Sequence, residues 1–145
     1  MQARRGELID VLESGMGVLA LDPTGALVGI VTWAVDAGDA AVDADGTAAE
    51  IRAVAVASAA RGGGVGRALL DAAAAALRAA GVRRAWLVTT NDNLAALALY
   101  QKAGWRLVAV RPGAIDELRR AIKPSIPELG QHGIRLRDEL VLEWP

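Results

Sequence analysis

A strand that runs through a glycine cluster into a helix is the feature that most constrains this fold. Apolar, partly β-branched residues predict a strand over Glu50–Ala57, and the Ala- and Leu-rich run Val65–Ala80 predicts a helix that Gly81 ends. Four glycines lie at or near the junction: Gly62, Gly63, Gly64 and Gly66. Glycine lets a backbone approach a ligand closely, and the unpaired N–H groups at a helix start attract anions. The junction is therefore a candidate phosphate-binding loop.

Two well-known nucleotide patterns do not fit this loop. The P-loop needs Lys and then Ser or Thr after its last glycine, where this chain has Arg67 and Ala68. The dinucleotide pattern needs a third glycine at positions that Arg67 or Leu69 occupies. Arg61 and Arg67 add positive charge on either side of the cluster. A turn without any ligand and a nucleotide-phosphate binder stay open as alternatives at this point.

The other elements follow from hydrophobic periodicity and from turn signals. A hairpin is predicted from Val18–Leu21 and Leu27–Val35, joined by an Asp-Pro-Thr-Gly turn. A short helix is expected over Arg4–Ser14, an exposed acidic loop over Ala37–Ala48 and a non-helical stretch over Lys123–Pro127. The remaining predicted elements are the strands Arg83–Thr90, Trp105–Arg111 and Arg137–Trp144 and the helices Leu94–Ala103, capped by Asn93, and Ala114–Ile122. This order predicts an α/β fold with a mixed sheet and helices on both faces.

Composition narrows the classes of protein. The 145 residues predict one domain over 1–145, and 53% apolar residues are enough to bury a core. A net charge of −1 argues against a nucleic-acid partner. With no cysteine and one histidine we expect no disulfide and no metal site. No apolar run is long enough for a membrane span or a signal peptide, so we expect a cytoplasmic protein without a membrane partner.

Two blocks together resemble a known family. The spacing Arg-x-x-Gly-x-Gly at Arg61, Gly64 and Gly66 is similar to the acetyl-CoA pyrophosphate loop of the GNAT superfamily of N-acetyltransferases. A second block from Asn93 through Tyr100 to a Gly-Trp pair is similar to the Asn and Tyr motif of that family. The resemblance implies a mostly antiparallel central sheet, splayed between the strands Glu50–Ala57 and Arg83–Thr90. It implies acetyl-CoA contacts from Val54, Ala55, Val56, Arg61, Gly62, Gly63, Gly64, Val65, Gly66, Arg67, Asn93 and Tyr100.

The resemblance also implies catalytic roles. Pantetheine would pair with the backbone of Val54–Val56, and the Val56 amide would stabilise the thioester oxyanion. Tyr100 would hydrogen-bond or protonate the leaving thiolate, the alternative being a core tyrosine. Glu50, which strand alternation puts on the face of Val54 and Val56, would be the general base through a water. Its alternative is an ion pair with Arg52 or a solvated strand end.

The acceptor is less constrained than the cofactor. Similar proteins line the acceptor pocket with the segment between the last two strands, so Arg111, Lys123 and His132 are weak candidates to contact a polar or anionic substrate. Solvated charges and a turn histidine are the alternatives. Trp33 belongs either to the core or to the wall of the acceptor pocket. A protein N-terminus is disfavoured as acceptor, because Val88 stands where such enzymes commonly carry Glu.

One departure from the family concerns the N-terminus. The family begins with a strand and a longer helical segment, and no strand pattern precedes Val18 here. We therefore expect the first strand to be missing, and the edge of Val18–Leu21 to be covered by the N-terminal segment or by a second copy of the chain. The resemblance leaves a homodimer open.

The function that the resemblance implies is direct acetyl transfer from acetyl-CoA to a primary amine. No covalent enzyme intermediate is expected, because the chain has no cysteine. A non-catalytic acyl-CoA-binding or sensing module is the alternative, since it needs the glycine loop but neither Glu50 nor Tyr100.

Overall fold

The computed structural model describes residues 8–11, 16–35 and 48–144. The chain divides into two compact units, residues 1–85 with residue 145, and residues 86–144. We call them the N-terminal unit and the C-terminal unit and describe each by itself. The single domain expected over residues 1–145 stays a prediction.

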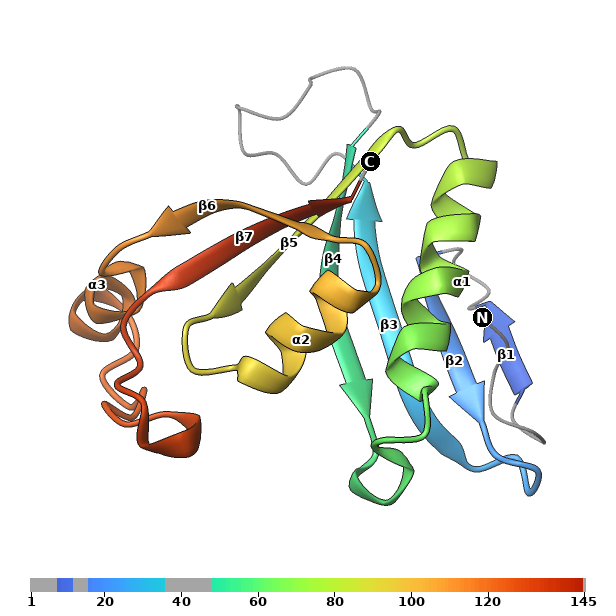
Figure 1. Cartoon of the computed structure of the whole chain (residues 1–145), viewed down its shortest axis with the longest axis horizontal. Coiled ribbons are helices and arrows are strands. Elements are labelled where there is room, and N and C mark those ends of the chain that lie inside the picture. Colours follow the sequence, from blue (N-terminus) through green and yellow to red (C-terminus); the bar gives the residue numbers. More distant parts are fainter. Residues whose placement is uncertain (1–7, 12–15, 36–47, 145) are drawn as a thin grey trace. The chain divides into compact units, whose positions relative to one another are not determined.

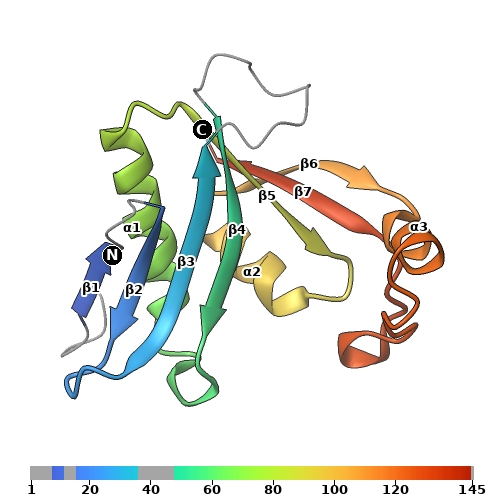
Figure 2. The ribbon, with the colours of Figure 1, turned by 180° about the vertical axis from the view of Figure 1, so that it is seen from behind.

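The N-terminal unit is an antiparallel sheet covered by one helix (Figures 1 and 2). Its strands lie in the order β1 (Leu8–Val11), β2 (Gly17–Leu21), β3 (Leu27–Val35) and β4 (Ala48–Val56). The helix α1 (Val65–Ala79) packs against β2, β3 and β4. Its buried face carries Leu69, Ala73 and Leu77, as the spacing of these residues predicts.

The hairpin between β2 and β3 forms as predicted. Asp22 Oδ1 accepts hydrogen bonds from the Thr24 amide at 2.8 Å, the Thr24 hydroxyl at 2.6 Å and the Ala26 amide at 3.0 Å. Gly25 has a φ of 84°, a conformation that favours glycine. This local chemistry fixes the turn, and alternate residues of β3 then face the core.

The N-terminal expectations need correction. Leu8–Val11 is a strand and not part of a helix over Arg4–Ser14, so a strand does precede the hairpin. It pairs with β2, with Leu8 opposite Leu21 and Val11 opposite Val18. The N-terminal segment therefore covers the edge of β2, which confirms the first of the two coverings expected. Of the acidic loop expected over 37–48, only Ala48 is described, and it is the buried first residue of β4.

The C-terminal unit combines three strands and two helices. They are β5 (Arg84–Thr90, in this unit from Trp86 on), α2 (Leu94–Lys102), β6 (Arg106–Arg111), α3 (Ala114–Ala121) and β7 (Glu139–Trp144). β7 lies between β5 and β6 and pairs antiparallel with β6. Within each unit, β1–β4 and β6–β7 pair antiparallel, which confirms a mixed α/β fold with a mostly antiparallel sheet. The expected splay between two strands stays a prediction.

A compact hairpin joins α3 to β7. Leu129 bridges to Arg135, and the short 3-10 helix η2 (Gln131–Gly133) forms its tip. The largely buried Arg119 of α3 holds both arms: its guanidinium donates to the carbonyl oxygens of Ile126, Pro127 and Leu136 at 2.9, 2.9 and 2.8 Å. Lys123–Pro127 is not helical, as its two prolines predict.

Candidate active site

The glycine loop leads into α1 with an open helix start. After β4 comes the 3-10 helix η1 (Ser58–Ala60), and Gly62 and Gly64 then take φ angles of 77° and 88°. Gly64 is the N-cap residue of α1, and no side chain accepts a hydrogen bond from the first turn. Backbone N–H groups at such a start have no partner within the helix. The loop can therefore offer them to an anion, aided by the helix dipole.

Close packing sets where this helix starts. Val65, the first residue of α1, is buried, and so is Leu69 one turn later. Gly29 of β3 lies directly beneath: a Cβ there would stand 2.8 Å from Leu69 Cδ1 and 3.0 Å from Val65 Cγ1. The absence of a side chain at Gly29 lets α1 approach the sheet closely at the end that carries the glycine loop.

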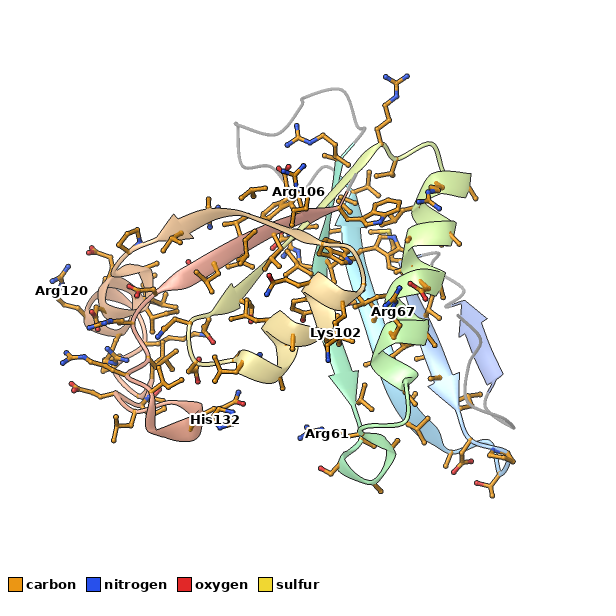
Figure 3. All side chains as sticks on the ribbon, viewed as in Figure 1. Arg61, Arg67, Lys102, Arg106, Arg120 and His132 are labelled. Atoms are coloured by element: carbon orange, nitrogen blue, oxygen red, sulfur yellow. The ribbon has the colours of Figure 1, made fainter. Side chains whose placement is uncertain are left out.

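The two arginines of the loop lie on different elements (Figure 3). Arg61, exposed on the loop after η1, donates through Nε to the Val56 carbonyl oxygen at 3.2 Å. Arg67, on α1, donates through Nε to Asp71 Oδ1 at 3.2 Å. Both guanidinium groups belong to the N-terminal unit together with the glycines, so positive charge accompanies the open helix start.

The end of β4 directs some of its backbone groups to the side away from β3, where the Val56 carbonyl accepts the hydrogen bond from Arg61. The Ala57 amide donates to the Val28 carbonyl at 2.8 Å, and Val56 stands opposite Gly29. In an antiparallel ladder, successive residues direct their N–H and C=O groups to opposite sides. Val54 and Val56 therefore direct theirs away from β3, whereas Ala55 directs its own toward β3. Of the three residues expected to contact pantetheine, Val54 and Val56 thus direct their backbone groups to the side away from β3, and their pairing with an extended ligand stays a prediction.

A β-bulge in β4 corrects the face expected for Glu50. Thr32 pairs with Ala53 and Trp33 with Ile51, so Arg52 is an extra residue. Opposite residues share a face, and Gly29, opposite Val56, faces α1. Val54 and Val56 therefore face α1, while Glu50, opposite Ala34, faces the other way. The expectation that Glu50 shares the face of Val54 and Val56 is wrong.

Glu50 also has an ionic partner. Its carboxylate lies 3.3 Å from Arg52 Nε, and its side chain is 21% exposed. The ion pair with Arg52, which was the alternative to a catalytic role for Glu50, is therefore formed. It lies at the β-bulge of β4. A role as general base stays a prediction.

Asn93 and Tyr100 lie on α2 in the C-terminal unit. The Asn93 side chain accepts a hydrogen bond from the Ala96 amide at 3.3 Å, which confirms the predicted N-cap. The Tyr100 ring lies 6.5 Å from that of the buried Trp105, centroid to centroid, with the two planes tilted by 54°. Burial raises the pKa of the Tyr100 phenol above its usual value. Tyr100 is thus protonated at neutral pH and suited to donate a hydrogen bond.

The weak acceptor candidates lie on different elements. Trp33 is buried, which agrees with its interpretation as a core residue. Arg111 is exposed on β6 opposite Glu139, and Lys123 is exposed beyond α3. His132 is exposed in η2, at the tip of the hairpin between α3 and β7, with a φ of 60° (Figure 3).

Sequence reasoning missed two polar residues of this region. Asn91 and Asp92, which join β5 to α2, make several hydrogen bonds with residues 130–138. The only local signal is the run Asn-Asp-Asn before a helix, which also suits a simple helix start. Their partners lie some forty positions away, where no sequence pattern points to them.

Searches for a metal site and a membrane span give nothing in the described part of the chain. There, no three His, Asp or Glu side chains gather as metal ligands would. Among the same residues, no helix has the length and hydropathy needed to cross a bilayer.

Comparison with known proteins assigns the family. The sequence model of the Acetyltransferase (GNAT) family matches residues 3–105. The uncharacterized Bacillus subtilis protein YdhI is 34% identical over 125 residues, or 86% of this chain and 71% of that protein. Another B. subtilis protein, YxbD, is 46% identical over 79 residues, or 54% of this chain and 49% of YxbD. The chain belongs to the GNAT acetyltransferase family.

Solved structures share the fold. A Bacillus subtilis acetyltransferase in complex with CoA matches with a TM-score of 0.71 at 23% identity, over 88% of this chain and 74% of that one. An IAA acetyltransferase from Bacillus cereus matches with a TM-score of 0.69 at 24% identity, over 88% and 75%. An acetyltransferase from Elizabethkingia anophelis with acetyl-CoA bound reaches 0.69 at 23% identity, over 88% and 73%.

Proposed function

We propose that the protein transfers the acetyl group of acetyl-CoA directly to a primary amine. One observation carries the proposal: the open start of α1, with its glycines and arginines, follows a strand whose last residues direct backbone groups away from β3. The first part suits a diphosphate, and the second suits the amide-rich pantetheine arm. Family membership and CoA-bound structures with the same fold support this assignment.

Each proposed residue has a chemical task in this transfer. The neutral amine attacks the thioester carbonyl carbon, and the new oxyanion accepts a hydrogen bond from the Val56 amide. The C–S bond then breaks, and the thiolate accepts a hydrogen bond or a proton from the Tyr100 hydroxyl. Glu50 removes the proton of the ammonium group through a water, once its carboxylate is released from Arg52. The amine class, a homodimer and a cytoplasmic location stay predictions, as does the absence of nucleic-acid and membrane partners.

Calorimetric titration with CoA tests the binding step. We expect micromolar binding and a higher melting temperature with CoA or acetyl-CoA, but no such shift with ATP or NAD. Arg61→Ala should weaken CoA binding, whereas Arg83→Ala, which removes an exposed arginine before β5, should not. A protein that binds ATP or NAD and not CoA would contradict the assignment and favour a nucleotide-phosphate binder.

A second candidate function is an acyl-CoA-binding module without catalysis. It is favoured by the ion pair between Glu50 and Arg52, which occupies the proposed base. Release of free thiol from acetyl-CoA with a panel of small amines decides between the two. Turnover that falls in Glu50→Gln at unchanged CoA affinity supports the enzyme, and no release with any amine supports the module.

A further inference from the structure

The junction between β5 and α2 is held by a buried carboxylate that the proposed chemistry does not use. Asp92 is 4% exposed. Its Oδ1 accepts a hydrogen bond from the Thr90 hydroxyl at 2.5 Å, and its Oδ2 accepts one from the Gln131 amide at 2.8 Å. Burying a carboxylate costs free energy unless hydrogen-bond donors compensate it. The Thr90 hydroxyl and the Gln131 amide provide this compensation only when the two segments lie in this arrangement.

The partner turn is shaped to receive this carboxylate. Gly130 lies so close to it that an added Cβ would stand 2.2 Å from Asp92 Oδ2 and 2.6 Å from its Cγ. Any side chain at Gly130 would therefore displace the carboxylate or the turn. His132 lies near enough to help lower the pKa of Asp92, together with the Thr90 and Gln131 hydrogen bonds, against the opposing effect of burial.

Asn91 extends the same connection along residues 135–138. Its Nδ2 donates to the Arg135 carbonyl at 2.8 Å, and its Oδ1 accepts from the amides of Arg137 and Asp138 at 3.1 and 3.0 Å. Its own amide donates to the Asp138 carbonyl at 3.1 Å. Asn91 and Asp92 thus connect the start of α2 to the hairpin between α3 and β7, whose two arms Arg119 also holds.

The helix that follows has little other support. α2 has no buried residue, although β6 contacts it and the Tyr100 ring lies by Trp105. The packing of α2 is limited to half-buried residues such as Leu97, Leu99 and Tyr100, so its polar start contributes more to its position than it would in a fully packed helix. Asp92 directly precedes Asn93, the N-cap of α2.

We propose that Asp92 is a positioning residue, which acts with Gly130 and Gln131 to fix the start of α2 and so to orient Asn93 and Tyr100 toward acetyl-CoA. This inference rests on the proposed function for its consequence in binding. The structural part of the inference, that the order of α2 depends on the Asp92 carboxylate, does not rest on the proposed function.

Three variants separate positioning from a general loss of stability. Asp92→Ala removes both acceptors. Asp92→Asn keeps one acceptor, for the Gln131 amide, and replaces the other by an NH2 group that can donate to the Thr90 hydroxyl oxygen. Asp22→Ala is the matched control, since its carboxylate also accepts backbone amides, those of Thr24 and Ala26 at 2.8 and 3.0 Å, but in the β2–β3 turn of the N-terminal unit. CoA affinity is measured by calorimetry below the melting temperature of every variant, and hydrogen exchange of α2 amides is measured without CoA.

We expect Asp92→Ala to weaken CoA binding about tenfold, the size expected for losing a hydrogen bond to a buried charge. Asp92→Asn should restore most of the affinity, and Asp22→Ala should keep it. Amides of Ala96–Lys102 should exchange faster in Asp92→Ala than in Asp22→Ala. Unchanged exchange in Asp92→Ala overturns the inference, as does equal weakening of CoA binding by Asp22→Ala. If the wild type binds no CoA, the proposed function fails, and hydrogen exchange alone still decides the role of Asp92.

Discussion

The helices α1 and α2 each follow a strand along the chain, α1 after η1 and the glycine loop, but they are held in opposite ways. α1 buries seven residues and starts at Gly64 without a side-chain cap. α2 buries none and starts at Asn93, whose side chain caps it, next to the hydrogen-bonded Asp92. The helix with a packed face can leave its first N–H groups to a ligand, because burial already holds it in place. The helix whose residues are at most half-buried depends more on its polar start for its stability.

The largest expected effect is on stability, through the packed face of α1. Leu69→Ala should lower the free energy of unfolding by about 2–5 kcal/mol, because the side chain is fully buried and leaves a cavity. Leu94→Ala in α2 should cost about 1 kcal/mol or less, because this leucine is 46% exposed. Urea denaturation measures both. Equal losses would break the contrast between the two helices.

A second prediction separates chemistry from packing in α2. Tyr100→Phe should lower turnover roughly 100-fold, in the range of general acid catalysis, while the ring beside Trp105 stays in place. CoA affinity and melting temperature should change little. Steady-state kinetics and calorimetry provide the measurements. Unchanged turnover would remove Tyr100 from the proposed mechanism and leave it with a packing role.

A third prediction tests whether packing positions the open start of α1. Gly29→Ala would bring a Cβ within 2.8 Å of Leu69 Cδ1, so the helix or the strand has to shift. We expect a stability loss of about 1–3 kcal/mol together with weaker CoA binding. Adding Leu69→Val removes the closest atom and should recover part of the CoA affinity, which a double-mutant cycle quantifies. No coupling between the two sites would contradict this account.

The smallest expected effect concerns pH. The pKa of Asp92 is lowered in the folded protein, so its contribution to stability is present above the unfolded pKa of about 3.9 and is lost as pH falls through the lower, folded pKa. Acidification below about pH 4 should therefore shift the amide signals of α2 in NMR spectra before those of α1.

Two variants control this experiment. Asp92→Asn should remove the acid-induced change in α2. Asp22→Asn should leave it, because the pKa of Asp22 is also lowered, chiefly by the Thr24 hydroxyl, but in the β2–β3 turn. If the amide signals of α1 and α2 changed at the same pH, the start of α2 would not respond to acid separately, and the prediction would be contradicted.

Much of the fold and of the candidate site was predictable, because its signals are local. The glycines with positive φ, the Asn93 cap, the Asp22 turn and the apolar face of α1 each depend on residues a few positions apart. Such patterns locate helices, turns and the glycine loop without knowledge of distant partners.

Tertiary structure decided what depends on distant partners. The strand Leu8–Val11 follows from pairing with β2, which outweighs a weak helical pattern. The bulge at Arg52 turns Glu50 away from the face of Val54 and Val56, and an extra residue in a ladder exists only relative to the opposite strand. The sequence alone determined where a glycine-rich helix start forms. Only the folded chain could bring Asp92 to Gln131, because hydrogen bonds between residues far apart in sequence depend on how the backbone is arranged in space.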